Sequence, residues 1–315
     1  MRVELTAAVL ETDEHAEEVC DLLRHFNKKR HAWVVPPQLA RTAESFIERN
    51  LAPQLAPTYK QLALKASKQQ HAYRTPTASV PVKIWPEIIK ECVEDLGRPA
   101  VLVVENNHSD GLFVKGIAKL FKASDILEAV EKRWLEIEHG GGGDTYRRAR
   151  EKHESFHRVK RAATLLDSDR WAPGTPAKNA HRIAELRELG LGVHVLTLRE
   201  AENYVPNNVL HAVKPIRTSL ARLDHLKQLD HDQRGHFDMK HGFRKTSGVP
   251  EQQQQLFAGT RPQVIRGLDQ GFGQNILEVF EAMADHLSED DLARNVGEDV
   301  PGELRGLLAM LREIL

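Results

Sequence analysis

The sequence predicts an α/β fold in which a parallel sheet carries helices on both faces. Three observations support this prediction. Short apolar runs rich in valine and leucine recur through the middle of the chain, a helix-like segment follows each of the first three, and the regions on either side show helical spacing instead. We therefore expect a mostly helical N-terminal extension over residues 1–97, a catalytic α/β domain over 98–245 and a helical C-terminal region over 246–315.

The composition is that of an ordinary globular protein. The 315 residues are 41% hydrophobic and 28% charged, with a formal net charge of -1, so the overall charge does not indicate a nucleic-acid binder. No apolar run reaches the about 18 residues of a membrane span, and the N-terminus lacks the layout of a signal peptide. Cys20 and Cys92 are far apart in the sequence, which fits a reducing compartment. We expect a cytoplasmic protein with no membrane partner.

The N-terminal extension shows mainly amphipathic spacing. We expect helices over residues 11–30, 39–50, 58–70 and 87–96, and one short strand over 80–84. No chemistry is evident here, so packing or partner docking is the expected role.

The central domain alternates strands with helices. The run at 100–104 is apolar and β-branched throughout, as expected of a strand that is buried on both faces. The order of elements predicts parallel strands joined by helices. The expected strands are 100–104, 133–138, 162–166 and 193–198, and the expected helices are 112–121, 144–159 and 175–189.

Carboxylates follow three of these strands. Glu105 follows the first strand, Asp167 and Asp169 follow the third, and Glu200 and Glu202 follow the fourth. Parallel strands share a direction, so these side chains are expected at one edge of the sheet. Crowded carboxylates raise one another's pKa, and a hard divalent ion such as Mg²⁺ or Mn²⁺ relieves that repulsion. The sequence therefore predicts a metal site at this edge.

Three segments resemble the TOPRIM domain, the metal-binding fold shared by topoisomerases, bacterial primases and nucleases of the "overcoming lysogenization defect" type. They are Val-Val-Glu at 103–105, Asp-Ser-Asp at 167–169 and Arg-Glu-Ala-Glu-Asn-Tyr at 199–204. The last run is most similar to the nuclease branch. The resemblance covers about residues 98–245 and implies a TOPRIM-like sheet.

The resemblance also implies roles for individual residues. Glu105 matches the first acid of the family, which is a metal ligand or general base. Asp167 and Asp169 match the paired metal ligands. Glu202 matches a further ligand of the nuclease branch, and Glu200 supports it.

Two more residues match the family pattern less closely. Asp110 corresponds to a second acid after the first strand, but lies one residue farther from Glu105 than the pattern places it, and Asn106 stands where the pattern has glycine. Lys240 corresponds to a late lysine that stabilises charge in the transition state.

The function implied by the resemblance is that of a metal-dependent endonuclease, with DNA favoured over RNA. Since no ATPase motif is evident, a separate ATPase is expected as a partner, and antiviral defence as the setting. Self-association into a homo-oligomer is also expected. The alternatives are a primase-like nucleotidyltransferase on the same scaffold and a non-catalytic regulatory subunit.

Other motifs have competing interpretations. His-Glu-x-x-His at 153–157 matches a zinc protease motif, but the charged helix around it favours a solvated face. Asp-Ser-Asp alone also suits an aspartyl phosphatase or a glycosyltransferase, although Trp171 stands where such a phosphatase has threonine or valine. The glycines at 140–143 suit a phosphate contact or a plain turn.

Two further patterns concern the second half of the chain. Four histidines in a polar segment are expected at surface or loop positions, and one of them, beside Lys240, is a candidate phosphate contact. A leucine stripe at helical spacing near the C-terminus is expected to be core or a dimer contact. The histidines are His225, His231, His236 and His241, and the leucines are Leu304, Leu307, Leu308, Leu311 and Leu315.

Overall fold

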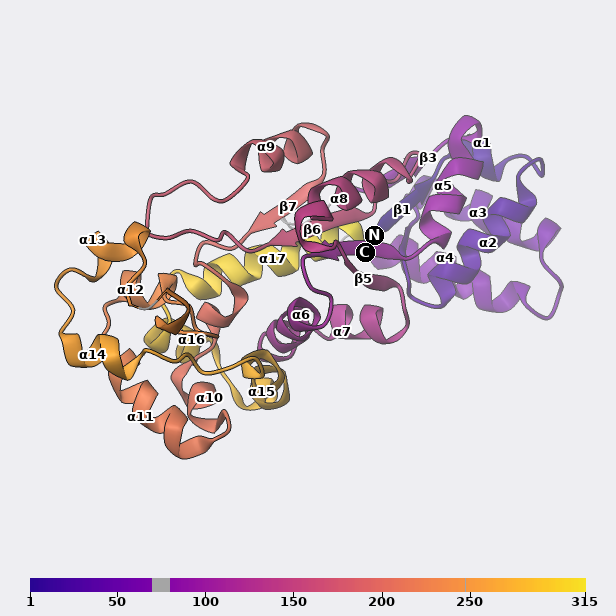
Figure 1. Ribbon diagram of the computed structural model, residues 1–315. Coiled ribbons are helices and arrows are strands. Elements are labelled where there is room, and N and C mark those ends of the chain that lie inside the picture. The colour runs from indigo at the N-terminus through magenta and orange to yellow at the C-terminus, as the bar shows by residue number, and fades with distance from the viewer. Residues whose placement is uncertain (70–79, 247) are drawn as a thin grey trace.

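Two parallel sheets, each flanked by helices, make up the chain in a computed structural model that describes residues 1–69, 80–246 and 248–315 (Figure 1). The N-terminal sheet and its helices form one end of the molecule. The second sheet lies in the middle, and helices from the second half of the chain form the other end. The predicted α/β class is confirmed at this level.

The N-terminal unit contains a sheet that the sequence did not predict. Its three parallel strands are β1 (Arg2–Leu5), β2 (Ala32–Val34) and β3 (Val82–Ile84), in the order β2-β1-β3. Its helices are α1 (Ala7–Leu10), α2 (Ala16–Asn27), α3 (Ala40–Asn50), α4 (Ala56–Gln69) and α5 (Ile89–Gly97), with single 3-10 turns at Pro37–Leu39 and Pro86–Ile88.

Most of the described residues in this unit are helical, as expected, but the expectation of a single strand is corrected here. Only the strand expected over 80–84 is confirmed, as β3, whereas β1 and β2 were missed. These strands have four and three residues, so each shows only one or two inward positions, such as Val3 and Leu5 in β1. A pattern that short does not reveal its period. The four expected helices are present with shifted bounds, and α4 begins two residues earlier than expected.

The central sheet has four parallel strands, as predicted. They are β4 (Ala100–Val104), β5 (Leu135–His139), β6 (Ala162–Leu166) and β7 (Gly192–Val195), in the order β5-β4-β6-β7. The last strand is shorter than the expected 193–198 because the chain leaves the ladder after Val195. The amide of Thr197 instead donates to Glu303, at 2.8 Å.

The helices that surround this sheet continue to the end of the chain. They are α6 (Ser109–Leu120), α7 (Ser124–Glu131), α8 (Thr145–Glu154), α9 (Ala180–Glu188), α10 (Asn207–Ala212), α11 (Ile216–Leu226), α12 (His231–His236), α13 (Gln254–Phe257), α14 (Pro262–Gly267), α15 (Ile276–Met283), α16 (Glu289–Asn295) and α17 (Val300–Ile314). Short 3-10 turns lie at Gly142–Asp144, Ala201–Tyr204, Arg244–Thr246, Glu251–Gln253 and Ala284–His286.

Both faces of the central sheet are buried. Leu102 and Val104 of β4 belong to the same core as α6, α7 and α17, whereas Val101 and Val103 pack with α8 and α9 on the other face. Alternate side chains of a strand point to opposite faces, so a strand covered on both sides must be apolar throughout. The continuous apolar run of β4 is explained in this way.

The C-terminal leucine stripe completes one layer of this core. Leu304, Leu307, Leu308 and Leu311 are buried, and α17 runs along β4, β6 and β7 (Figure 1). The interpretation of the stripe as core is confirmed. In the described ranges 1–69, 80–246 and 248–315, no helix combines the length and apolar character needed to cross a membrane.

A buried carboxylate connects the two sheet units. Asp95, at the end of α5, is completely buried and accepts hydrogen bonds from three successive backbone amides just before β6. The donors are His157 at 3.0 Å, Arg158 at 2.7 Å and Val159 at 2.9 Å. One side chain therefore fixes the entry to β6 against the N-terminal unit.

A buried arginine lies next to this carboxylate. Arg161 is completely buried and donates to the carbonyl oxygens of Leu96 at 3.2 Å, Arg98 at 2.5 Å and Ile314 at 2.9 Å. Leu96 and Arg98 lie at the end of α5, and Ile314 lies at the end of α17. Asp95 and Arg161 are called the junction below.

Candidate functional site

The carboxylates predicted from the sequence lie at the carboxyl-terminal edge of the central sheet. Glu105 directly follows β4, Asp167 and Asp169 follow β6, and Glu200 and Glu202 lie in the segment after β7. These three strands are adjacent and parallel, so their ends share one edge. With Asp110, these residues are called the acidic edge below.

Asp167 is the acid most affected by its neighbours. The residue is half-buried, and the loss of solvent around its carboxylate raises its pKa well above the ordinary value. The charges of Asp110, Glu200 and Glu202 raise that pKa further. The Oδ1 atom accepts a hydrogen bond from the Ala201 amide at 3.1 Å, which ties the end of β6 to the segment after β7.

Asp169 lies in the same turn as Asp167 but has a different partner. Its φ of +49° is left-handed, a conformation that aspartate tolerates better than most residues, and its Oδ2 atom lies 2.9 Å from Lys178 Nζ. Between the two aspartates, the buried Ser168 hydroxyl donates to the Leu198 carbonyl at 2.7 Å. The serine therefore fixes the turn that presents both carboxylates.

Glu105 has a pKa near neutrality. Burial is the largest cause, and the charges of Asp169 and Asp110 add to it, raising the pKa to about 7. Lys178 and Lys240 oppose this rise without cancelling it. A carboxylate with this pKa can accept a proton at neutral pH and release it again.

Asp110 is held in the first turn of α6. Its carboxylate accepts from the Asn106 amide at 2.8 Å and from the Ser109 hydroxyl at 3.2 Å. Burial raises its pKa, although these hydrogen bonds lower it. Despite its unusual spacing in the sequence, Asp110 lies within electrostatic range of Glu105 and Asp167.

Lys240 bridges the two glutamates after β7. Its Nζ atom lies 3.1 Å from Glu200 Oε2 and 3.2 Å from Glu202 Oε1. Burial lowers the lysine pKa, but the charges of Glu202 and Glu200 outweigh burial and leave the pKa above its ordinary value. Lys240 is therefore a permanent cation within the acidic edge.

The C-terminal region holds Lys240 in place. The Phe272 amide donates to the Met239 carbonyl at 2.7 Å, and the Gly273 amide donates to the Lys240 carbonyl at 3.1 Å. Gly242 has a φ of +68°, and a Cβ there would lie 2.4 Å from the Leu268 carbonyl oxygen. Residues beyond 245 thus position a residue of the acidic edge, which the sequence did not indicate.

The segment that carries Glu200 and Glu202 is anchored by side chains inside it. The buried Asn203 accepts from the Glu200 amide at 3.1 Å and donates to the carbonyls of Arg234 and Phe237, both at 2.9 Å. Arg234 is buried in turn and donates to the Asn203 carbonyl at 3.1 Å. These contacts fix the backbone on both sides of Glu202.

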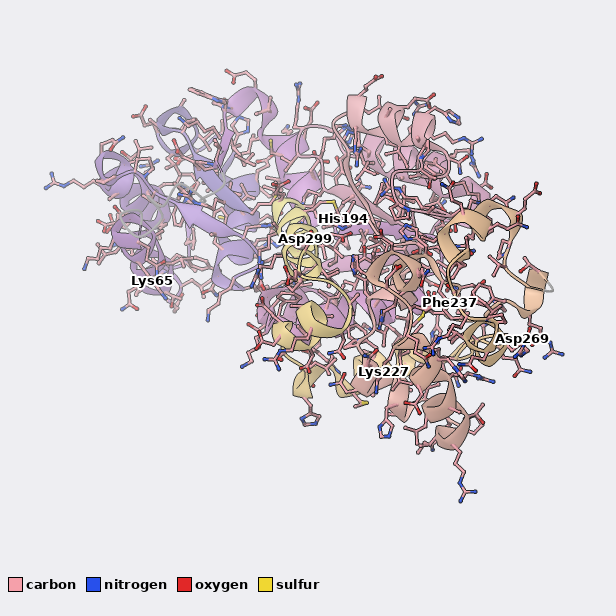
Figure 2. All side chains as sticks on the ribbon, turned by 90° about the vertical axis from the view of Figure 1, so that its left-hand side faces the viewer. Lys65, His194, Lys227, Phe237, Asp269 and Asp299 are labelled. Carbon is pink, nitrogen blue, oxygen red and sulfur yellow. The ribbon has the colours of Figure 1, made fainter. Side chains whose placement is uncertain are left out.

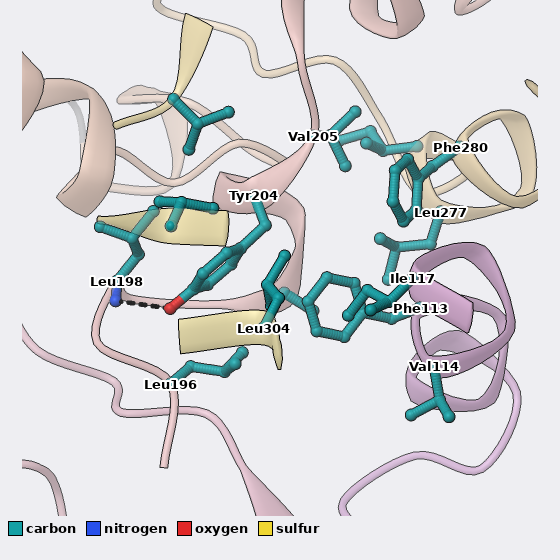
Figure 3. Packing of buried hydrophobic residues seen from close by; sticks show 14 of the residues in the cluster. Phe113, Val114, Ile117, Leu196, Leu198, Tyr204, Val205, Leu277, Phe280 and Leu304 are labelled. Atoms are coloured by element: carbon teal, nitrogen blue, oxygen red, sulfur yellow. Dashed lines mark hydrogen bonds between the residues drawn. The ribbon is translucent and has the colours of Figure 1, made fainter. Parts of the chain in front are cut away.

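Tyr204 fixes the same segment to α17. Its hydroxyl accepts from the Leu198 amide at 3.0 Å and donates to Glu303 at 2.7 Å, and its ring packs beside Phe113 and Leu304 (Figure 3). The sequence analysis treated Asn203 and Tyr204 only as parts of a motif. The polar side chains of these two residues, just after the expected strand 193–198, were the signal in the sequence from which their anchoring role could have been predicted.

Two cations near the carboxylates were also missed. Lys178 lies in the loop before α9, and nothing in the sequence links it to Asp169. Arg199 donates to Glu200 at 3.2 Å, and its guanidinium lies 4.4 Å from the centre of the Trp171 ring. Both contacts depend on loops whose paths the sequence does not reveal.

The acidic edge does not contain a preformed metal cage. Within residues 1–69, 80–246 and 248–315, no three His, Cys, Asp or Glu side chains are arranged to hold a metal ion. Lys240, Lys178 and backbone amides now contact the carboxylates. The donors themselves suit Mg²⁺ or Mn²⁺, which prefer carboxylate oxygens, so an ion would bind by replacing lysine contacts.

The zinc motif is contradicted. Helix α8 ends at Glu154, so His157 lies beyond the helix and does not share a face with His153. His153 is buried, whereas His157 is half exposed and lies 3.7 Å from Glu94. The expectation of a solvated helix face is also wrong at His153, because this side chain is buried.

The glycine loop after β5 has a structural explanation. Gly141 and Gly142 have φ values of +80° and +60°, which are left-handed, and a Cβ on Gly140 would lie 2.5 Å from Thr145 Oγ1. The loop therefore needs glycine to turn tightly into α8. A phosphate contact there stays a prediction.

The histidines of the second half do not form a cluster. His231 contacts the Val296 carbonyl at 2.7 Å, His236 contacts the Asp232 carbonyl at 2.8 Å, and His241 contacts Gln274 at 3.1 Å. His236 is buried, which corrects its expected surface position. A phosphate contact by His241, which follows Lys240 directly, stays a prediction.

Comparison of the chain with protein-family models, with curated proteins and with solved structures finds no match.

Proposed function

We propose that the acidic edge binds Mg²⁺ or Mn²⁺ and hydrolyses phosphodiester bonds in nucleic acid, with DNA as the favoured substrate. The observation that supports this most strongly is the convergence of six carboxylates at the ends of three adjacent strands. Burial raises the pKa values of Glu105, Asp110 and Asp167, and the charges of neighbouring carboxylates raise those of Glu105 and Asp167 further. A purely structural site gains nothing from such repulsion, whereas a site for cations does.

The ligands proposed for the ion are Asp110, Asp167, Asp169 and Glu202, with Glu105 beside them. When bound, a divalent ion stabilises the negative charge of the phosphodiester and of the leaving oxygen. These acids come from different elements, so binding would also fix the loops that carry them relative to one another.

Glu105 is the proposed general base. A water oxygen attacks the phosphorus, its proton passes to the Glu105 carboxylate, and the bond from phosphorus to the leaving sugar oxygen breaks. A pKa of about 7 leaves a large fraction of Glu105 unprotonated at neutral pH. Lys240, whose charge is permanent, would stabilise the negative charge that develops on the phosphate, with Glu200 orienting it.

The test is cleavage of supercoiled plasmid DNA, and of an RNA of matched length, with Mg²⁺ or Mn²⁺. The wild-type chain is compared with Glu105→Gln and Asp167→Asn, which keep the shape of each side chain, and with Glu136→Gln as a control on an exposed residue of β5. We expect metal-dependent cleavage that falls at least about 100-fold in the first two variants and is unchanged in the control. No cleavage by the wild-type chain, or full activity in both site variants, would contradict the proposal.

A further inference from the structure

A cavity lies at the contact between the N-terminal unit and the central unit, and no residue of the acidic edge lines it. Its volume is about 820 Å³, and its walls come from α2, β2, α4, α7 and the end of α17. Cavities of this size accommodate ligands of nucleotide dimensions. This space is called the interunit cavity below.

The interunit cavity has an excess of cationic groups. Lys29 and Lys65 line it, and neither side chain has a hydrogen-bond or ion-pair partner among the described residues. Arg30 also lines it and donates through Nη2 to the Arg98 carbonyl, but its buried Nε atom lacks a partner there. Three cationic side chains thus retain donors that a bound anion could satisfy.

The acidic side chains of the cavity are already paired. Asp125 binds Arg312, with Nε and Oδ2 2.7 Å apart, and Glu128 pairs with Lys132. The Leu315 oxygen lies 3.1 Å from His31 Nδ1. The charge that remains to be balanced in the cavity is therefore positive.

Aromatic rings form another part of the lining. Trp33 stacks on Phe26 with ring centroids 5.5 Å apart and planes inclined by 11°, so its position is fixed. Trp134 at the start of β5 is half-buried, and Lys132 lies over its ring, 4.7 Å from the centroid. Trp33 is largely buried, so the half-buried ring of Trp134 is the main aromatic surface next to the cations. Such a surface matches a ligand that combines an aromatic ring with negative charge.

We propose that the interunit cavity binds a nucleotide, with the phosphate groups on Lys29, Lys65 and Arg30 and the base against the tryptophan surface. Lysine and arginine donate charge-assisted hydrogen bonds to phosphate oxygens, and aromatic rings stack with bases. The carboxylates of the acidic edge take no part in this site. Figure 2 shows Lys65 in the N-terminal unit, well separated from Phe237, which lies three residues before Lys240.

A nucleotide here would bind without a divalent ion, because cationic side chains supply the positive charge. It would also contact both units at once, since α4 belongs to the N-terminal unit and α7 to the central one. Bound nucleotide should therefore stabilise the folded chain against heat.

The experiment is calorimetric titration of the full chain with ATP in EDTA, with adenosine and tripolyphosphate as probes that each carry one half of the ligand. The test variant is Lys29→Glu with Lys65→Glu. The matched control is Lys28→Glu with Lys68→Glu, which changes neighbouring exposed lysines that do not line the cavity. A further variant, Asp167→Asn, shows whether ATP binds at this cavity or at the acidic edge.

We expect ATP to bind more tightly than either partial probe. The test variant should weaken ATP binding at least about tenfold, while the control variant and Asp167→Asn leave it within about twofold. Circular dichroism establishes that all variants are folded. The proposal is overturned if the wild-type chain does not bind ATP, if the control variant weakens binding as much as the test variant, or if Asp167→Asn abolishes it.

Discussion

The junction and the acidic edge both bury charge, but they balance that charge differently. At the junction, Asp95 accepts from three backbone amides and Arg161 donates to three backbone carbonyls at the ends of α5 and α17. At the acidic edge, Asp167 receives one backbone hydrogen bond and lies close to other carboxylates that raise its pKa. The buried carboxylate of the junction is matched by backbone amides, whereas the carboxylates of the acidic edge repel one another.

The lysines of the acidic edge strengthen this contrast. Lys240 and Lys178 neutralise part of the negative charge through side chains that a divalent ion could displace. Backbone amides, by contrast, cannot leave Asp95 without unfolding the chain around it. A difference of this kind separates a structural charge from a proposed catalytic one.

The largest effect on stability is expected at the junction. Asp95→Ala leaves three backbone amides without their acceptor, one of them buried and two part-buried, and removes the charge beside Arg161. We expect a loss of about 3–5 kcal/mol in the free energy of unfolding. Urea denaturation measures it, and Glu94→Ala, an exposed acid one residue earlier, should change it by less than about 0.5 kcal/mol. Equal effects of the two substitutions would refute the structural role of Asp95.

A smaller effect is expected when a cation is removed from the acidic edge. Lys240→Met removes the cation that bridges Glu200 and Glu202, so that Arg199 remains as the counter-charge of Glu200 alone. We expect a loss of about 2–3 kcal/mol in metal-free buffer, less than at the junction because Lys240 is partly exposed.

Added Mn²⁺ should restore most of the stability lost by Lys240→Met, since the ion replaces the missing charge. Thermal melts with and without Mn²⁺ measure this, and Lys227→Met serves as the exposed control. A Lys240→Met variant that Mn²⁺ does not stabilise would count against a cation site at this edge.

The smallest effect concerns pH. The pKa of Glu105 rises from 4.5 to about 7 on folding, so its stabilising contribution is fully present below pH 4.5 and is lost as the pH rises through 7. Between pH 5 and pH 8, the wild-type chain should therefore lose about 1–2 kcal/mol relative to Glu105→Gln, after allowance for partial exposure. Parallel pH dependences of the two proteins in urea denaturation would show that Glu105 does not titrate in this range.

The sequence predicted the central sheet well because its physical signal is strong there. β4 and β6 are each buried on both faces, which requires apolar residues throughout and makes the strands visible. Because parallel strands end at one edge, the positions of Glu105 and Asp167 followed directly. The three- and four-residue strands of the N-terminal sheet offered too few positions for any period to show.

The contacts made by loops could not be predicted in the same way. Lys178 reaches Asp169 because the loop before α9 folds back, and its amide donates to the Ser168 carbonyl at 3.0 Å. Lys240 was found by resemblance, but its support by residues 268–273 depends on a turn that packs against a distant segment. Such contacts join residues that are far apart in the sequence, and local patterns carry no information about them.

Binding of Mn²⁺ by the acidic edge tests the central claim most directly. Isothermal titration calorimetry at pH 7.5, without nucleic acid, compares the wild-type chain with Asp167→Asn, which preserves the shape of the side chain but removes a carboxylate of the acidic edge. We predict that the wild-type chain binds Mn²⁺ and that the folded variant binds it at least about tenfold more weakly. Wild-type protein that takes up no Mn²⁺, or a variant that binds it equally well, would contradict the account.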